Sequence, residues 1–177
     1  MKKIKVAIIV GSDSDLPVIE NATKVLDDFN ILYSLNVASA HRSPEYVKQC
    51  VRLAERSGAK VFIAAAGMSA ALPGVVASET ALPVIGIPLE GKSLSGLDAL
   101  FSIVQMPPGI PVGTVALGKP GATNAAVLAA EILALSDSSL KNKIKNYRKK
   151  LSDTIIEKDK VLKKSGIRKY ISQYQKK

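Results

Sequence analysis

Residues 4–17 read Ile4-Lys5-Val6-Ala7-Ile8-Ile9-Val10-Gly11-Ser12-Asp13-Ser14-Asp15-Leu16-Pro17, and this stretch decides the fold class. The apolar run from Ile4 to Val10 is typical of a buried strand in a parallel sheet that is covered on both faces. Gly11 ends the run, and the polar residues and Pro17 suit the start of a helix. The stretch therefore predicts a strand, a tight turn and a helix.

The same alternation recurs along the chain. Strands are predicted over 31–37, 61–66, 82–89 and 112–117, and helices over 44–57, from 94 onward and over 122–135. The proline-rich residues 102–111 are predicted as an ordered loop. No repeat or linker separates these units, so the sequence predicts one domain over 1–177. Its core, 1–135, is expected to be a three-layer α/β/α sandwich, and 136–177 a helical extension.

The formal charge of +10 is concentrated in residues 141–177, which hold 14 Lys and Arg against 3 Asp and Glu, whereas residues 1–140 hold 11 against 12. Apolar residues there recur at intervals of four, three, four and four, at Leu140, Ile144, Tyr147, Leu151 and Ile155. This pattern predicts an amphipathic helix whose lysines face solvent and whose apolar side docks on the domain or on a neighbouring subunit. A nucleic-acid patch is the alternative, but no aromatic platform or DNA-binding motif accompanies it.

The sequence predicts a cytoplasmic protein that contacts no membrane. No apolar run reaches the roughly 18 uncharged residues of a membrane span, and Lys2-Lys3-Ile4-Lys5 leads into the first strand without a signal-peptide pattern. The single cysteine, Cys50, cannot form an internal disulfide. Its place in an apolar helical pattern predicts a core position.

The only histidine lies in Val37-Ala38-Ser39-Ala40-His41-Arg42-Ser43-Pro44, directly after the second predicted strand. Histidine can give or take a proton near neutral pH, and the guanidinium of arginine suits phosphate or carboxylate. His41 and Arg42 therefore form a candidate acid-base group beside a candidate anion contact. The alternative is a solvated loop histidine with an arginine neighbour.

Three loops are expected to converge, because ligands of open parallel sheets gather at the carboxyl ends of strands where the strand order reverses. The first turn offers helix N–H groups and serine hydroxyls to a phosphate, and Asp15 could accept from sugar hydroxyls. Helix capping by Ser14 or Asp15 is the alternative. The loop 64–74 has little side-chain bulk, which suits either a closely approaching ligand or tight packing. The G-x-G-x-x-G spacing and the Walker A lysine are both missing.

Four segments together resemble the PurE family of purine biosynthesis over residues 4–135: G-S-D-S-D at 11–15, S-A-H-R at 39–42, A-L-P-G-V-V-A-S at 71–78 and S-G-L-D-A-L-F-S-I-V-Q-M-P-P-G-I-P-V at 95–112. The resemblance implies an isomerase, N5-carboxyaminoimidazole ribonucleotide mutase, which moves a carboxylate from the exocyclic nitrogen of its substrate to ring carbon C4. It also implies a flavodoxin-like sheet, a homo-octamer, a small ribonucleotide as partner, no nucleic acid, and no metal or organic cofactor.

The same resemblance implies the site. His41 is the acid-base group, Ser12, Ser14 and Arg42 bind the 5′-phosphate, and Asp15 holds the ribose hydroxyls. The third loop is expected to receive the migrating carboxylate on backbone N–H groups and to exclude water, so that CO2 is retained. The remaining substrate-binding residues are expected to be Ser39, Ala40, Gly67, Ser69, Ala70 and Leu72.

One departure leaves a second activity open. Mutases of the family commonly read G-G-A-A-H-L-P-G in the third loop, and Ala71 stands here in place of the histidine. The related carboxylases, which use free CO2, tend to read A-G-R-S-N-A-L-S-G, and Gly67, Ser69 and Ala71 agree with that pattern. Arg42, Pro73 and the long segment 95–112 favour the mutase.

A flavodoxin-like nucleotide- or flavin-binding module is the alternative of another class. A receiver module would need an aspartate at the end of the third strand, where the chain has alanines and Gly67.

Overall fold

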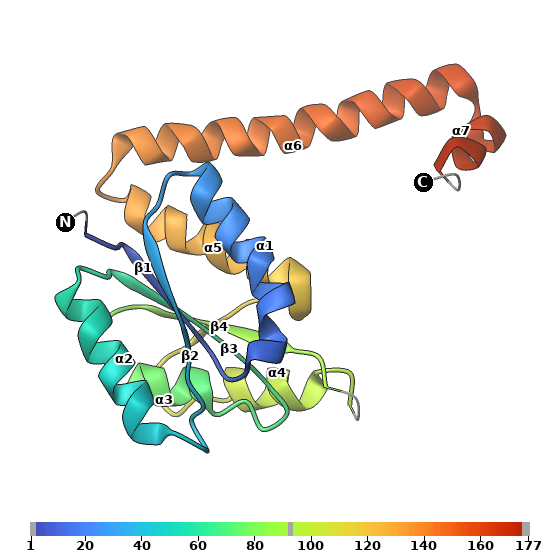
Figure 1. Ribbon diagram of the computed structural model, residues 1–177. Coiled ribbons are helices and arrows are strands. Elements are labelled where there is room, and N and C mark those ends of the chain that lie inside the picture. The colour runs from blue at the N-terminus through green and yellow to red at the C-terminus, as the bar shows by residue number, and fades with distance from the viewer. Residues whose placement is uncertain (1–2, 92–93, 175–177) are drawn as a thin grey trace.

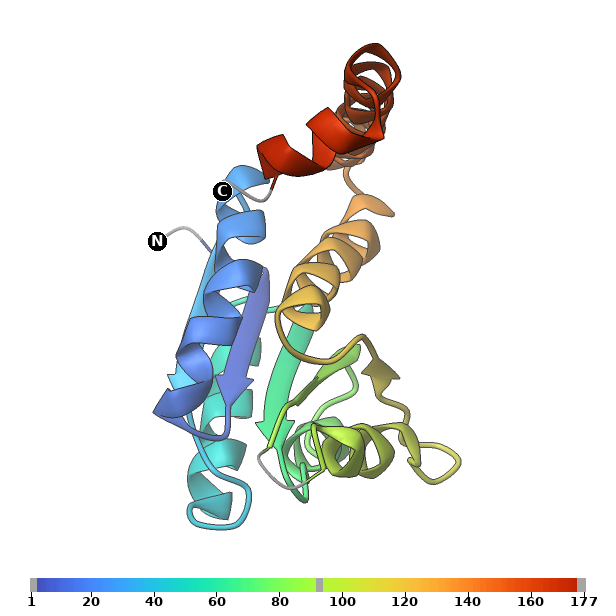
Figure 2. The same ribbon diagram turned by 90° about the vertical axis from the view of Figure 1, so that its right-hand side faces the viewer.

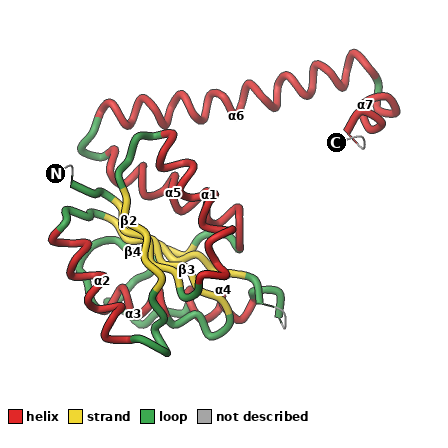
Figure 3. Tube along the Cα trace, in the orientation of Figure 1, coloured by secondary structure: helices red, strands yellow, loops and turns green. Residues whose placement is uncertain are grey.

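The computed structural model describes residues 3–91 and 94–174 and contains a five-stranded parallel sheet with the order β2-β1-β3-β4-β5 (Figures 1 and 3). This arrangement confirms the predicted α/β sandwich. The strands are β1 (Val6–Val10), β2 (Tyr33–Val37), β3 (Val61–Gly67), β4 (Val84–Leu89) and β5 (Gly113–Thr114). The helices are the short 3-10 turn η1 (Asp13–Asp15), α1 (Leu16–Asp28), α2 (Pro44–Arg56), α3 (Leu72–Ser78), α4 (Leu97–Val104), α5 (Gly118–Ala134), α6 (Ser138–Ser165) and α7 (Ile167–Tyr174).

The strand order reverses at β1, which pairs with β2 on one side and β3 on the other. Val6 is in register with Tyr33 of β2 and with Val61 of β3. The chain therefore passes from β1 to β2 at one edge of the sheet. It then returns to the other side of β1, where β3, β4 and β5 extend the sheet. A crevice at the carboxyl ends of β1 and β3 follows from this topology.

Helices cover both faces of the sheet (Figures 1 and 2). On one face α1 packs against α5, and their apolar sides enclose alternate strand residues such as Ile8 and Ile63. On the other face α2, α3 and α4 cover the intervening residues, such as Ile9 and Phe62. Because both faces are buried, β1, β3 and β4 consist of continuous apolar runs rather than alternating ones.

Several strands are shorter than the sequence predicted. The first begins at Val6 rather than Ile4, the second at Tyr33 rather than Ile31, and the fourth at Val84 rather than Leu82. The largest difference is at β5, predicted over 112–117, which spans only two residues. The chain turns away there because α5 begins at Gly118, four residues before the predicted start at Ala122.

Glycine and proline explain the helix boundaries that the sequence misplaced. Gly121 lies in the first turn of α5, and a Cβ atom there would lie 1.7 Å from the carbonyl oxygen of Ala116, so only glycine fits. α4 begins at Leu97 rather than Leu94, because Ser95 and Gly96 have φ angles of 50° and 84°, which a right-handed helix does not allow. α3 begins at Leu72, inside the loop predicted over 64–74, and Pro73 suits its first turn.

The predicted C-terminal helix is two helices, α6 and α7, separated at Gly166 with a φ of 75°. The first part of α6 is anchored: Leu140 and Ile144 are buried, and the ring of Tyr147 meets that of Phe29 edge to face at 5.5 Å. Beyond it the helix projects away from the sandwich (Figure 1). Its predicted apolar side is therefore only partly covered, with Leu151 and Ile155 52% and 64% exposed.

Cys50 is buried within α2, as predicted, and burial raises the pKa of its thiol. Among residues 3–91 and 94–174, no helix is both long enough and apolar enough to cross a membrane.

Candidate active site

The carboxyl ends of β1, β2, β3 and β4 meet at one edge of the sheet, and the segments that follow them line a cleft of about 680 Å³. This edge is at the bottom of Figure 2. The cleft includes every residue that the sequence predicted for the site: Ser12, Ser14, Asp15, Ser39, Ala40, His41, Arg42, Gly67, Ser69, Ala70 and Leu72. A smaller cavity of about 480 Å³ at the opposite edge contains none of them.

Ser12, rather than Ser14 or Asp15, is the N-cap of the helical turn η1, and Asp15 completes its capping box but forms no side-chain cap hydrogen bond to α1. The same turn also lines the cleft. The N–H of Ser12 donates to Asp15 Oδ2 at 3.1 Å, and the N–H of Ser14 donates to Ser12 Oγ at 3.3 Å. The Ser14 hydroxyl also donates to Ser12 Oγ, at 2.8 Å. These bonds fix both serine hydroxyls at the mouth of the cleft, where η1 presents its N-terminus.

Burial raises the pKa of the Asp15 carboxyl above its ordinary value of 3.8, and the charge of Asp13 adds a smaller effect in the same direction. Hydrogen bonds from the Ser12 N–H and the Ser14 side chain oppose that shift and lower the pKa. Desolvation has the largest effect because the carboxyl is half-buried at the base of the first turn. An acceptor in this position suits a donor such as a sugar hydroxyl.

The second loop holds Arg42 against the first. Arg42 Nη2 donates to the carbonyl oxygen of Gly11 at 3.2 Å, and Arg42 Nε donates to Ser39 Oγ at 3.3 Å. Ser43 stabilises this turn, since its hydroxyl accepts from the Ser39 N–H at 3.1 Å. The guanidinium is exposed, so its remaining N–H groups are open to an anion beside Ser12.

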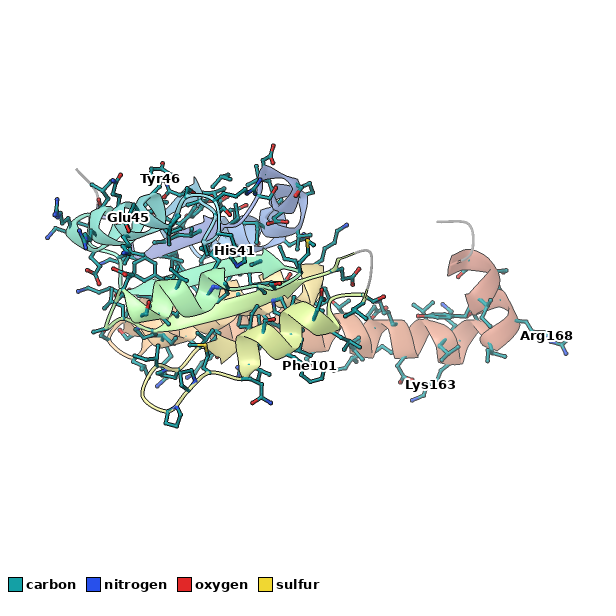
Figure 4. All side chains as sticks on the ribbon, turned by 90° about the horizontal axis from the view of Figure 1, so that it is seen from below. His41, Glu45, Tyr46, Phe101, Lys163 and Arg168 are labelled. Atoms are coloured by element: carbon teal, nitrogen blue, oxygen red, sulfur yellow. The ribbon has the colours of Figure 1, made fainter. Side chains whose placement is uncertain are left out.

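His41, labelled in Figure 4, lines the cleft at the same edge of the sheet. Its side chain is exposed, and no described residue forms a hydrogen bond with either ring nitrogen. Both nitrogens are therefore available to a ligand. The cleft of the single chain is therefore accessible to a ligand at His41.

The third loop follows β3 at Gly67 and leads into α3. The N–H of Ala70 donates to the carbonyl oxygen of Gly67 at 3.1 Å, so this N–H already has a partner within the loop. The N–H of Ser69 has no hydrogen-bond partner among the described residues and remains available. Leu72 is buried at the start of α3 and forms the floor of the cleft rather than its polar wall.

Met68 has a φ of 55°, in the left-handed region. That conformation costs a residue with a Cβ atom about 1 to 2 kcal/mol. The residue is 71% exposed.

The sequence missed several residues of the cleft: Gly11, Ala66, Met68, Ala71, Leu89, Glu90 and Gly91. Glu90 and Gly91 follow β4 directly, and the rule that pointed to the first three strand ends would have pointed to this one as well. Glu90 adds an exposed carboxylate to the lining of the cleft. Among the described residues, no cluster of three or more His, Cys, Asp or Glu side chains could hold a metal ion.

Comparison with known proteins identifies similar chains along most of this sequence. Residues 5–154 match the family described as AIR carboxylase. The N5-carboxyaminoimidazole ribonucleotide mutase of Pyrococcus abyssi is 54% identical over 94% of this chain and 95% of its own. Proteins with the same name from Thermotoga maritima and Escherichia coli K12 are each 46% identical, over 96% and 86% of this chain and 98% and 90% of their own.

Solved structures agree with the sequence comparisons. The crystal structure of Treponema denticola PurE superposes with a TM-score of 0.82 at 33% identity, covering 91% of this chain and 99% of that one. A single-substitution variant of Treponema denticola PurE2 gives a TM-score of 0.83 at 32% identity, over 92% and 99% of the two chains. These likenesses do not favour the flavin-binding or receiver modules.

Proposed function

This chain belongs to the AIR carboxylase family, and we propose that it is an N5-carboxyaminoimidazole ribonucleotide mutase of purine biosynthesis. The proposal is carried by the agreement between sequence identity to named relatives and the arrangement of residues around the cleft. Relatives with this name are 44–54% identical over most of the chain. Independently, the fold brings His41, Arg42 and the serines of the first turn around one cleft.

The phosphate is assigned to the junction of the first two loops. Arg42 is held there by Gly11 and Ser39, close to Ser12 and the N-terminus of η1. A dianionic phosphate gains charge-assisted hydrogen bonds from the guanidinium and neutral ones from the hydroxyls of Ser12 and Ser14. Asp15, next along the turn, is then in place to accept from the ribose hydroxyls. This end of the cleft fixes the substrate without taking part in the chemistry.

His41 is assigned the proton transfers. The protonated ring gives its proton to the exocyclic nitrogen as the N–C bond of the carbamate breaks and CO2 leaves. Carbon C4 of the electron-rich aminoimidazole then attacks CO2, a C–C bond forms, and the neutral ring removes the C4 proton. The proton lost in the first step is regained in the last, so the enzyme ends unchanged. Both free nitrogens of His41 are compatible with this shuttle.

We assign binding of the migrating carboxylate to the third loop. The N–H and hydroxyl of Ser69 are available donors, and Gly67 and Ala70 leave room for close approach. Ala71 puts no ionisable side chain at the start of α3. His41 is therefore the only histidine that can serve the reaction in this chain.

One assay tests the activity. The purified protein is given either N5-carboxyaminoimidazole ribonucleotide or aminoimidazole ribonucleotide with bicarbonate, without ATP, and 4-carboxyaminoimidazole ribonucleotide is followed. We expect faster conversion of the carboxyamino substrate. Conversion only of aminoimidazole ribonucleotide with bicarbonate would assign the chain to the carboxylases, and no conversion of either would contradict the proposal.

We also propose that the enzyme is a cytoplasmic homo-octamer. The outer side of α4 exposes Leu97, Phe101 and Val104 at helical spacing, and the edge strand β2 exposes Leu35 and Val37. Exposed apolar side chains on one face of a helix, as on α4, are typical of contacts between subunits. A phosphorylated substrate is retained within the cell, which supports the location. Light scattering of the Phe101→Asp variant should give a smaller assembly, and an unchanged octamer would remove α4 from the interface.

A further inference from the structure

Met68 has an unusual backbone conformation for its residue type. Three described residues other than glycine have a positive φ: Asn30 at 57°, Met68 at 55° and Ser95 at 50°. Asparagine is comparatively tolerant of this region, whereas methionine gains nothing from it locally. Of the three, only Met68 lines the cleft. A strained residue in a binding site suggests that its side chain is needed there.

The side chain is held at its base and free at its end. Its Cγ lies 3.7 Å from the position that a Cβ atom would occupy on Gly91, so the stem rests against the segment that follows β4. The residue as a whole is 71% exposed, which leaves most of its apolar surface without a partner among the described residues. The left-handed conformation thus presents a long apolar group at the rim, between the ends of β3 and β4.

The chemistry proposed for this cleft needs such a group. CO2 must remain beside carbon C4 after it leaves nitrogen, yet His41 is exposed and the cleft is open. A thioether side chain is flexible, apolar and forms favourable contacts with aromatic rings. It supplies no proton and competes for none.

We propose that Met68 is a positioning residue that covers the aminoimidazole ring of the bound substrate and keeps released CO2 from water. This inference rests on the proposed mutase function. It assigns to Met68 a part in substrate affinity and in the fate of CO2, and no part in proton transfer. The strain of its backbone is then the cost of placing this side chain over the ligand.

Three variants test the assignment. Met68→Gly removes the cover and relieves the backbone, Met68→Leu keeps an apolar side chain of similar volume, and Asn30→Gly relieves the matching φ at the opposite edge of the sheet. For each we measure KM, kcat, the thermal midpoint, the mass of the assembly, and the fraction of substrate that ends as aminoimidazole ribonucleotide and CO2.

In Met68→Gly we expect the thermal midpoint to be unchanged or higher, KM to rise about tenfold, and the decarboxylated fraction to rise several-fold. Met68→Leu and Asn30→Gly should keep the wild-type KM and partition. Wild-type KM and partition in Met68→Gly would overturn the assignment, as would a lower midpoint or a changed assembly mass, since these indicate a structural or intersubunit role. No turnover by the wild-type enzyme would overturn the proposed function as well.

Discussion

The guanidinium of Arg42 donates to the carbonyl oxygen of Gly11 at 3.2 Å and so ties the loop after β2 to the loop after β1. The two residues are 31 positions apart in the sequence, and the bond joins the end of one strand to the end of its neighbour. The arginine is therefore oriented before any ligand arrives. Its affinity for an anion does not have to compensate for ordering a free side chain.

We expect Arg42→Ala to raise KM for the ribonucleotide about 10- to 100-fold with a smaller change in kcat. The variant loses charge-assisted hydrogen bonds to the phosphate, each worth about 1.5 to 3 kcal/mol. Steady-state kinetics give both constants. Arg52→Ala, on the exposed side of α2, is the matched control and should leave KM unchanged. An unchanged KM in Arg42→Ala would show that the phosphate binds elsewhere.

His41→Asn should reduce kcat by about 10² to 10⁴ while the fold and the affinity for the nucleotide are kept. Asparagine fits the exposed position but cannot transfer protons. Stopped assays measure turnover, and isothermal calorimetry with aminoimidazole ribonucleotide measures binding. Turnover at the wild-type rate would end the acid-base role of His41, whereas loss of binding together with turnover would make it a substrate contact instead.

Asp15→Asn should stabilise the fold at neutral pH and weaken substrate binding. Because burial raises the pKa of Asp15 in the folded protein, its contribution to stability is fully present below the ordinary value of 3.8 and is lost as pH rises through the raised pKa. The amide of the Asp15→Asn variant carries no charge at any pH, so the variant does not lose this stability as pH rises. Thermal unfolding at several pH values should therefore show a gain over wild type at pH 7 that shrinks towards pH 3. A gain independent of pH would contradict the burial argument.

Gly121→Ala should destabilise the protein by about 1 to 3 kcal/mol or prevent folding, because the new methyl group would overlap the carbonyl group of Ala116. Gly113→Ala in β5 is the control: its Cβ atom would lie 3.7 Å from the nearest neighbour, at ordinary contact distance. Urea unfolding gives both free energies. Equal stability of the two variants would show that α5 can shift away from the preceding segment.

The buried strands could be predicted from the sequence because each is an apolar run that ends at a small or polar residue, as β1 does at Gly11. The cleft followed from the strand ends together with the resemblance of four segments to a known family. The limits of α4 and α5 could not be predicted, since they depend on the left-handed φ of Ser95 and on the close approach of Ala116 to Gly121. The part of α6 that the domain itself covers could not be predicted either, because spacing indicates an apolar side but not what covers it.

The projecting helix α6 gives the molecule an uneven distribution of charge. Residues 1–140 have a slight excess of acidic side chains, 12 against 11, and residues 141–177 carry 14 basic side chains against 3 acidic ones. Proteolytic clipping early in α6 would consequently reverse the direction of migration in a native gel at neutral pH. Intact protein would bind a cation-exchange resin that the clipped domain would not, so chromatography during purification reports directly whether this arm is still attached.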